Sequence, residues 1–196
     1  MKKLLLLTVL LIPFLCFSQS EHLKFRDIEI NGTATQFLSK LKNLGYIVKD
    51  VDSDGYTMKG KFAGDDCTLY IYSSPKTKTV YKIVVVFSEK SSWHSLKNQY
   101  NSIKEQLTNK YKNPTQNNCF FKSPYYDGDG YEMQAVKNNK CLWLTQWNLE
   151  SGEISLAIYS TCSVIIQYED KINMQKKAKE DEEIRQEKNK KMQNDL

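Results

Sequence analysis

Two acidic stretches could bind a metal ion: DSDGYTM at residues 52–58 and DGDGYEM at residues 127–133. The first stretch and the residues before it match the first half of an EF-hand loop, in which carboxylate oxygens surround Ca²⁺. Its candidate ligands are Asp50, Asp52 and Asp54. Such a loop needs a bidentate acid at its twelfth position, and Lys61 stands there instead. These acids are therefore only a weak candidate for a calcium site.

The alternative interpretation of both stretches is a tight turn. Asp-Gly between two alternating runs is typical of a β-hairpin, because Asp and Gly accept the positive φ that such turns need. The second stretch fits calcium less well, since Tyr125 occupies the first ligand position and Val136 the twelfth. We predict a hairpin at the first stretch, and we expect no cofactor.

No side chain stands in a recognisable catalytic motif. The sequence has no G-x-S-x-G, no H-E-x-x-H and no glycine-rich phosphate loop. We predict that His94 is a surface residue at a helix start and that His22 lies in a flexible end. The chain is therefore expected not to be an enzyme, with a site built from scattered carboxylates as the alternative.

The cysteines suggest disulfides, given the oxidising compartment of an exported protein. Cys16 lies in an N-terminal apolar segment, and the other four are Cys67, Cys119, Cys141 and Cys162. An even number of cysteines in an exported protein suggests two disulfides. Three pairings are open, and we favour Cys119–Cys141, which would fasten a long connection to a strand. Metal binding is disfavoured because no C-x-x-C is present.

Residues 1–18 have the form of a secretory signal. Lys2 and Lys3 precede an apolar run that is too short to span a membrane. Leu15 before Cys16 argues against a lipoprotein signal. Without the signal the formal charge falls from +5 to +3, and charges of both signs are interspersed, so no nucleic-acid partner is expected. We predict an exported protein, periplasmic or extracellular, with no integral membrane segment in the mature chain.

Three segments have the features of helices. Residues 31–45 carry leucines and a phenylalanine on one helical face, a Thr33–Gln36 capping box and a stop at Gly45. Residues 93–111 show the clearest apolar period of three and four residues. Residues 170–196 carry many charges of both signs, which favours a solvated helix over a partner-docking coiled coil.

Four β-like runs follow each of the first two helices. They are YIVKDV, YTMKGKF, CTLYIYS and TVYKIVVVF, then YEMQAV, CLWLTQW, EISLAIY and CSVIIQY. Residues 114–130 are expected to be irregular. LYIYS at 69–73 is similar to LAIYS at 156–160, which suggests an internal duplication. That alignment pairs YTMKGKF with CLWLTQW, so the two acidic stretches are not equivalent positions.

Tyrosines mark a possible recognition surface. Leu69 and Ile71 share one face of their strand, which leaves Tyr70 and Tyr72 on the other, and the repeat equates Tyr72 with Tyr159. Tyrosine offers a large contact area with few rotors, so an open aromatic sheet face suits protein recognition. The alternative is that tyrosine is merely tolerated on a β surface. Trp143 and Trp147 are assigned to the core.

The duplicated order of one helix and four strands, in a small exported chain, resembles the β-lactamase-inhibitor-protein-like fold. The run YKIVVVFSEKSSWHSLKNQYNSIKEQLTNKY is also similar to uncharacterised secreted proteins of Bacteroidetes. The resemblance is architectural and covers about residues 27–170. It implies tandem units that share one curved sheet, with a concave face that grips an enzyme, and it transfers no contact residue.

We therefore predict an α+β fold of two tandem units, each a helix plus a four-stranded antiparallel sheet, with helices on one sheet face and a charged C-terminal helix. The expected parts are a signal at 1–18, units at 19–90 and 91–169, and a helical tail at 170–196. The predicted function is a non-enzymatic binding or scaffolding module for a protein partner. The alternatives are an inhibitor of an extracytoplasmic hydrolase, a calcium-stabilised structural protein and a carboxylate-site enzyme.

Overall fold

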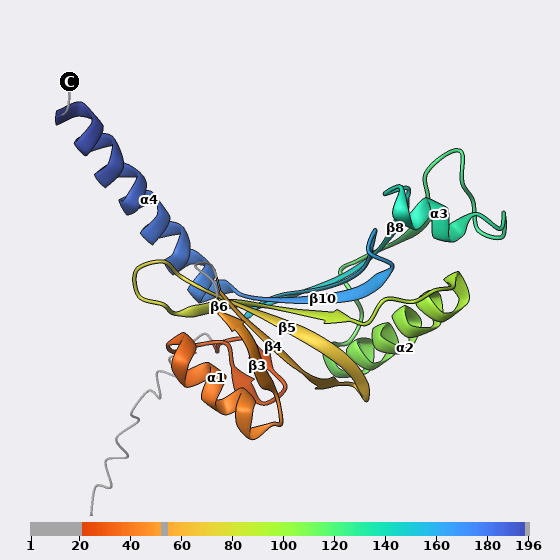
Figure 1. Ribbon diagram of the computed structural model, residues 1–196, viewed down its shortest axis with the longest axis horizontal. Helices are drawn as coiled ribbons and strands as arrows, with labels where there is room; N and C mark the ends of the chain where they lie inside the picture. The colour runs from red at the N-terminus through yellow and green to blue at the C-terminus, as the bar shows by residue number, and fades with distance from the viewer. Residues whose placement is uncertain (1–20, 52–54, 195–196) are drawn as a thin grey trace, which may run out of the picture.

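The computed structural model describes residues 21–51 and 55–194, and they form an α+β fold. Four helices accompany an antiparallel sheet of eight strands and a small two-stranded hairpin. Helices α1 and α2 lie on the same side of the large sheet, whereas α4 projects away from one end of it (Figure 1). In the part of the chain that the structure describes, no helix is both long and apolar enough to cross a membrane.

The large sheet has the strand order β3-β4-β5-β6-β10-β9-β8-β7. Its first four strands are β3 (Ile47–Val51), β4 (Gly55–Phe62), β5 (Asp65–Ser73) and β6 (Val80–Phe87). The other four are β7 (Gln116–Phe121), β8 (Cys141–Leu149), β9 (Gly152–Tyr159) and β10 (Ser163–Asp170). Each half of the chain contributes four strands, and the halves meet where β6 pairs with β10. This arrangement confirms the predicted α+β fold with an antiparallel sheet.

Helix α1 (Ala34–Asn43) begins and ends as its sequence predicts. The Thr33 side chain accepts a hydrogen bond from the Gln36 backbone, and the Gln36 side chain accepts one from the Thr33 backbone. Gly45 follows the helix with a φ of 88°, a conformation that favours glycine. Phe37 and Leu41 are fully buried under the first half of the sheet.

Helix α2 (Trp93–Tyr111) covers the second half of the sheet on the same side. Its apolar stripe packs on β9 and β10, with Leu96, Tyr100 and Ile103 buried. Trp93 meets Trp143 edge to face, with ring centroids 4.9 Å apart. The prediction that Trp143 and Trp147 belong to the core is confirmed, since they are 5% and 1% exposed.

The connection between α2 and β8 differs from the prediction. Residues 116–121, expected to be irregular, form the edge strand β7, and YEMQAV forms helix α3 (Glu132–Lys137) instead of a strand. The run alternates polar and apolar residues, which is typical of a strand, but a helix this short needs to bury only Ala135 and Val136. β7 and β3 are the two edge strands of the sheet, and the second acidic stretch leads into a helix.

The four cysteines in the described residues are unpaired, so the expected disulfides are not present. Strand register explains why Cys119 and Cys141 do not face each other directly. Cys119 lies opposite Trp143, and Cys141 lies opposite Phe121, which leaves the two cysteines on a diagonal. Cys67 lies on β5, and Cys162 lies in the turn between β9 and β10.

The N-terminal end is ordered by a hairpin of β1 (Lys24–Phe25) and β2 (Ile28–Glu29). Phe25 is fully buried and meets Tyr168 of β10 edge to face, with centroids 5.4 Å apart. Helix α4 (Lys171–Asn194) starts where β10 ends. The last buried residue of α4 is Glu180, and residues 183–194 are exposed throughout.

Candidate binding surface

One face of the eight-stranded sheet carries no helix between α4 and α3 in the described part of the chain (Figure 1). Side chains alternate along each strand, so one set points to the helices and the other points away. In β5, Leu69 and Ile71 are fully buried, whereas Thr68, Tyr70 and Tyr72 are half-buried or exposed. We call the side with this second set the uncovered face.

An aliphatic row crosses the middle of the uncovered face. The register places Val86 opposite Ile165, Ile165 opposite Ala157, and Ala157 opposite Leu144. All four side chains are half-buried, and Leu144 and Ala157 also line a cavity beside Val136 of α3. The row joins strands from both halves of the chain, so its apolar surface is continuous across the place where the halves meet.

The predicted tyrosines lie on the uncovered face in different surroundings. Tyr70 and Tyr159 are 39% and 41% exposed, and the Tyr159 hydroxyl accepts a hydrogen bond from Gln167 at 2.9 Å. Tyr72 is half-buried against Tyr81, with ring centroids 6.5 Å apart, and Lys177 of α4 lies over the Tyr81 ring. Tyr70 and Tyr159 are therefore free for contact, whereas Tyr72 takes part in the junction with α4.

A broad depression of about 820 Å³ lies at the β3–β5 side of the sheet. Its apolar lining includes Ile47, which is 63% exposed, and Tyr70. Its charged lining is Arg26, Lys49, Lys59, Lys61 and Asp66. Asp66 is the single acid in this set, and it pairs with Lys61 at 3.1 Å. The depression is therefore basic and matches acidic groups of a ligand.

The structure brings no metal ligands together among residues 21–51 and 55–194. Asp50 is exposed, and its carboxylate accepts a hydrogen bond from the Val51 backbone at 2.9 Å. Asp52 and Asp54 lie outside the described residues. β3 and β4 pair as antiparallel neighbours on either side of these residues, as a hairpin requires.

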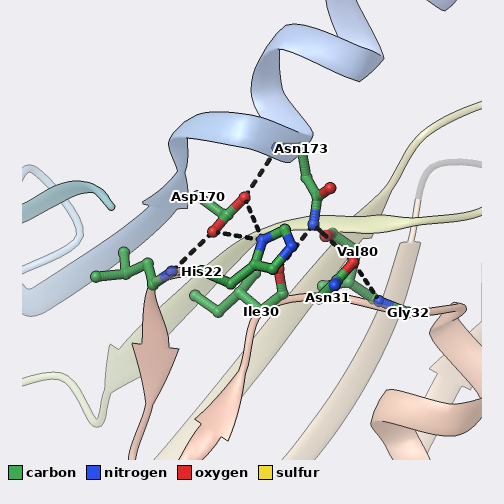
Figure 2. A network of polar contacts seen from close by, with 8 residues as sticks. His22, Ile30, Asn31, Gly32, Val80, Asp170 and Asn173 are labelled. Atoms are coloured by element: carbon green, nitrogen blue, oxygen red, sulfur yellow. Dashed lines mark hydrogen bonds and ion pairs between the residues drawn. The ribbon is translucent and has the colours of Figure 1, made fainter. Parts of the chain in front are cut away.

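His22 is not in a flexible end, contrary to the prediction. Its Nδ1 atom lies 3.0 Å from the carboxylate of Asp170, the fully buried last residue of β10 (Figure 2). The same carboxylate accepts hydrogen bonds from the backbone N–H groups of Leu23 and Asn173, both at 2.8 Å. Sequence reasoning had no signal for this contact, because 148 residues separate His22 from Asp170.

Asn173 extends this network from the first turn of α4. Its amide nitrogen donates to the carbonyls of Ile30 at 2.8 Å and Val80 at 3.0 Å (Figure 2). A His–Asp pair could support acid–base catalysis if a nucleophile stood beside it. No hydroxyl or thiol of the described residues is hydrogen-bonded to His22. The network therefore joins the N-terminal segment, β6 and α4.

His94 is a surface residue of α2, and its Nε2 atom lies 2.9 Å from the side-chain nitrogen of Asn98. Two of the cysteine thiols are no better suited to nucleophilic chemistry, because the thiolate is the reactive form. Burial raises the pKa of Cys67 to about 11 and that of Cys141 to about 12. These thiols are protonated at neutral pH, unlike an activated nucleophile.

A second buried contact anchors α4, and sequence reasoning missed it. Glu180 accepts hydrogen bonds from the hydroxyls of Ser74 and Thr77 and from the backbone of Lys76. The Lys76 ammonium group also lies within 3.0 Å of Glu183 and Glu187. The turn between β5 and β6 thus holds the middle of α4.

No protein-family model matches the chain, and comparisons with curated proteins and with solved structures found no match either.

Proposed function

We propose that this chain is an exported, non-enzymatic binding module that holds a protein partner against its uncovered face. The observation that carries the proposal is the aliphatic row of Val86, Ile165, Ala157 and Leu144, which lies between the exposed Tyr70 and Tyr159. Apolar surface of this extent across a sheet, with tyrosines at its margins, has the composition of an interface core. The signal-like residues 1–18 support the export.

The charges beside this row indicate the chemistry of the partner. Lys49 and Lys59 line the basic depression and form no ion pair with another described residue. An acidic partner surface would meet these cations and would be steered toward the face by them. The partner is therefore expected to present carboxylates next to an apolar contact that covers the row.

The test is affinity capture from envelope and secreted fractions, with the mature protein as bait. The face variant is Tyr70→Ser combined with Tyr159→Ser. The matched control is Tyr126→Ser combined with Tyr131→Ser. These tyrosines are 66% and 62% exposed, and they lie in the segment just before α3 and not in the strands of the sheet. A hot-spot tyrosine contributes enough that each loss on the face should weaken binding by about tenfold.

The proposal requires that one acidic partner is lost with the face variant, is kept with the control, and binds less tightly at high salt. Cross-links from the partner should then fall on the outward residues of β5, β6, β9 and β10. Equal capture by both variants, or cross-links confined to other surfaces, would show that the uncovered face is not the site. If the captured partner is a hydrolase, inhibition of its turnover would distinguish an inhibitor from a scaffold.

A further inference from the structure

A smaller cavity lies on the helix-covered side of the sheet, away from the aliphatic row. It has a volume of about 210 Å³ and separates α2 from the turn between β4 and β5. Its apolar wall consists of Phe62, Ala63, Ile103, Leu107, Tyr111 and Tyr168. Cavities for drug-sized ligands have about 300–1,000 Å³, so this one suits a smaller molecule. Three of the six wall residues are aromatic, which favours a planar ring as the ligand body.

Two tyrosine hydroxyls in this wall have no hydrogen-bond partner among the described residues: those of Tyr111 and Tyr168. Tyr168 is only 2% exposed, and buried hydroxyls are normally paired. Tyr168 lines the cavity, so a ligand bound there could pair with this hydroxyl. Burial raises the pKa of both tyrosines, which keeps them as neutral donors.

Two cations stand at the same cavity. Arg26, on the turn between β1 and β2, and Lys110, near the end of α2, both line it. Neither forms an ion pair with another described residue, and the Lys110 ammonium group lies over the Tyr111 ring at 5.4 Å. Asp27 is the acid whose charge reaches Tyr111. The cavity thus has two cations and two hydroxyl donors, and only one carboxylate of the described residues lies near them. This excess of positive charge and donors favours a ligand that carries an oxyanion.

We propose that this cavity binds a small aromatic monocarboxylate, with its ring between α2 and the β4–β5 turn and its carboxylate toward Arg26, Lys110 and the tyrosine hydroxyls. The ring fills the cavity and contacts its apolar wall. The carboxylate accepts hydrogen bonds from the tyrosine hydroxyls that have no partner among the described residues. This site lies away from the aliphatic row and shares only Arg26 with the basic depression, so Lys110 and Tyr168 test it independently of the partner proposed above.

The first experiment titrates the protein with phenylacetate and, as the neutral control of nearly the same shape, phenylacetamide. Binding is followed by chemical-shift changes of backbone amides in a ¹⁵N-labelled sample. For a ligand of this size we expect a Kd on the order of 1 mM for phenylacetate. The shifts should cluster at residues 62–63 and 103–111, and phenylacetamide should bind at least about tenfold more weakly. Equal binding of both compounds, or no saturable binding of phenylacetate, would overturn the proposal.

Three variants locate the site. Arg26→Gln and Lys110→Gln should each weaken phenylacetate binding by about fivefold to tenfold, because each removes one charge beside the carboxylate. Tyr168→Phe keeps the buried ring and should weaken binding by a few fold without unfolding the protein. Lys40→Gln, an exposed lysine of α1, is the charge-matched control and should bind normally. Undiminished binding by both cation variants would place the ligand elsewhere and refute the assignment.

Discussion

Replacing Asp170 by alanine should cost the protein much of its stability. Its carboxylate is fully buried and is the acceptor for two backbone N–H groups, those of Leu23 and Asn173, and for His22. The bond to Asn173 also caps α4, since Asn173 is the third helical residue after Asp170. Leaving each buried N–H unpaired costs about 1–3 kcal/mol, so Asp170→Ala should lower the free energy of unfolding by roughly 3–5 kcal/mol. That is a large part of the ~5–15 kcal/mol typical of a whole domain.

The assay is urea unfolding followed by far-ultraviolet circular dichroism, in reducing buffer because the cysteines are unpaired. Asp170→Asn retains one carbonyl oxygen as acceptor and should lose about half as much stability as alanine. Asp50→Ala removes an exposed carboxylate with one hydrogen bond to Val51 and should stay within about 0.5 kcal/mol of the native protein. If Asp170→Ala matched Asp50→Ala, the network of Figure 2 would not hold the two ends together.

Two further predictions concern α4 and the sheet interior. Burial opposes the charge of Glu180, but hydrogen bonds from Thr77, Lys76 and Ser74 outweigh it and lower the pKa of Glu180. Its stabilising effect is therefore present above the pKa of an unfolded glutamate and is lost as pH falls through the lower folded value. Glu180→Gln should cost about 1–2 kcal/mol at pH 7 in urea unfolding, and this cost should shrink as the pH falls below the ordinary glutamate pKa. A cost that does not change with pH would contradict this assignment. Gly60→Ala should lower the melting temperature and reduce the free energy of unfolding by about 1–3 kcal/mol, because the new Cβ would lie 2.3 Å from the Tyr46 ring. An unchanged melting temperature would show that the ring moves freely.

The sequence predicts elements well where local signals decide them. The Thr33–Gln36 capping box and the apolar period of residues 93–111 each fix a helix with contacts inside the same segment. YEMQAV fails because a six-residue run is too short to separate the two periods, and only its contacts with β8 and β9 decide for a helix. The face of Tyr70 and Tyr159 was predictable from alternation, since each strand is long and regular.

The parts that escaped prediction depend on contacts between distant segments. His22 meets Asp170 across 148 residues, and Glu180 meets Thr77 across 103. In one sequence such residues resemble any other polar surface positions, because burial, and not residue type, gives them their role. The small cavity has the same origin, since Arg26, Phe62 and Tyr168 come together only when the sheet has closed.

The pairing of β6 with β10 has a consequence for how the chain folds. Within each half, most strands pair with a neighbour along the chain, whereas Val86 and Ile165 are about 80 residues apart. Pairing β6 with β10 therefore closes a longer loop and has the larger entropic cost. We expect the two halves to form their local hairpins first and to join at β6 and β10 in a later, slower step. The aliphatic row is completed only in that step, so a chain that has not finished folding has no complete surface to offer a partner.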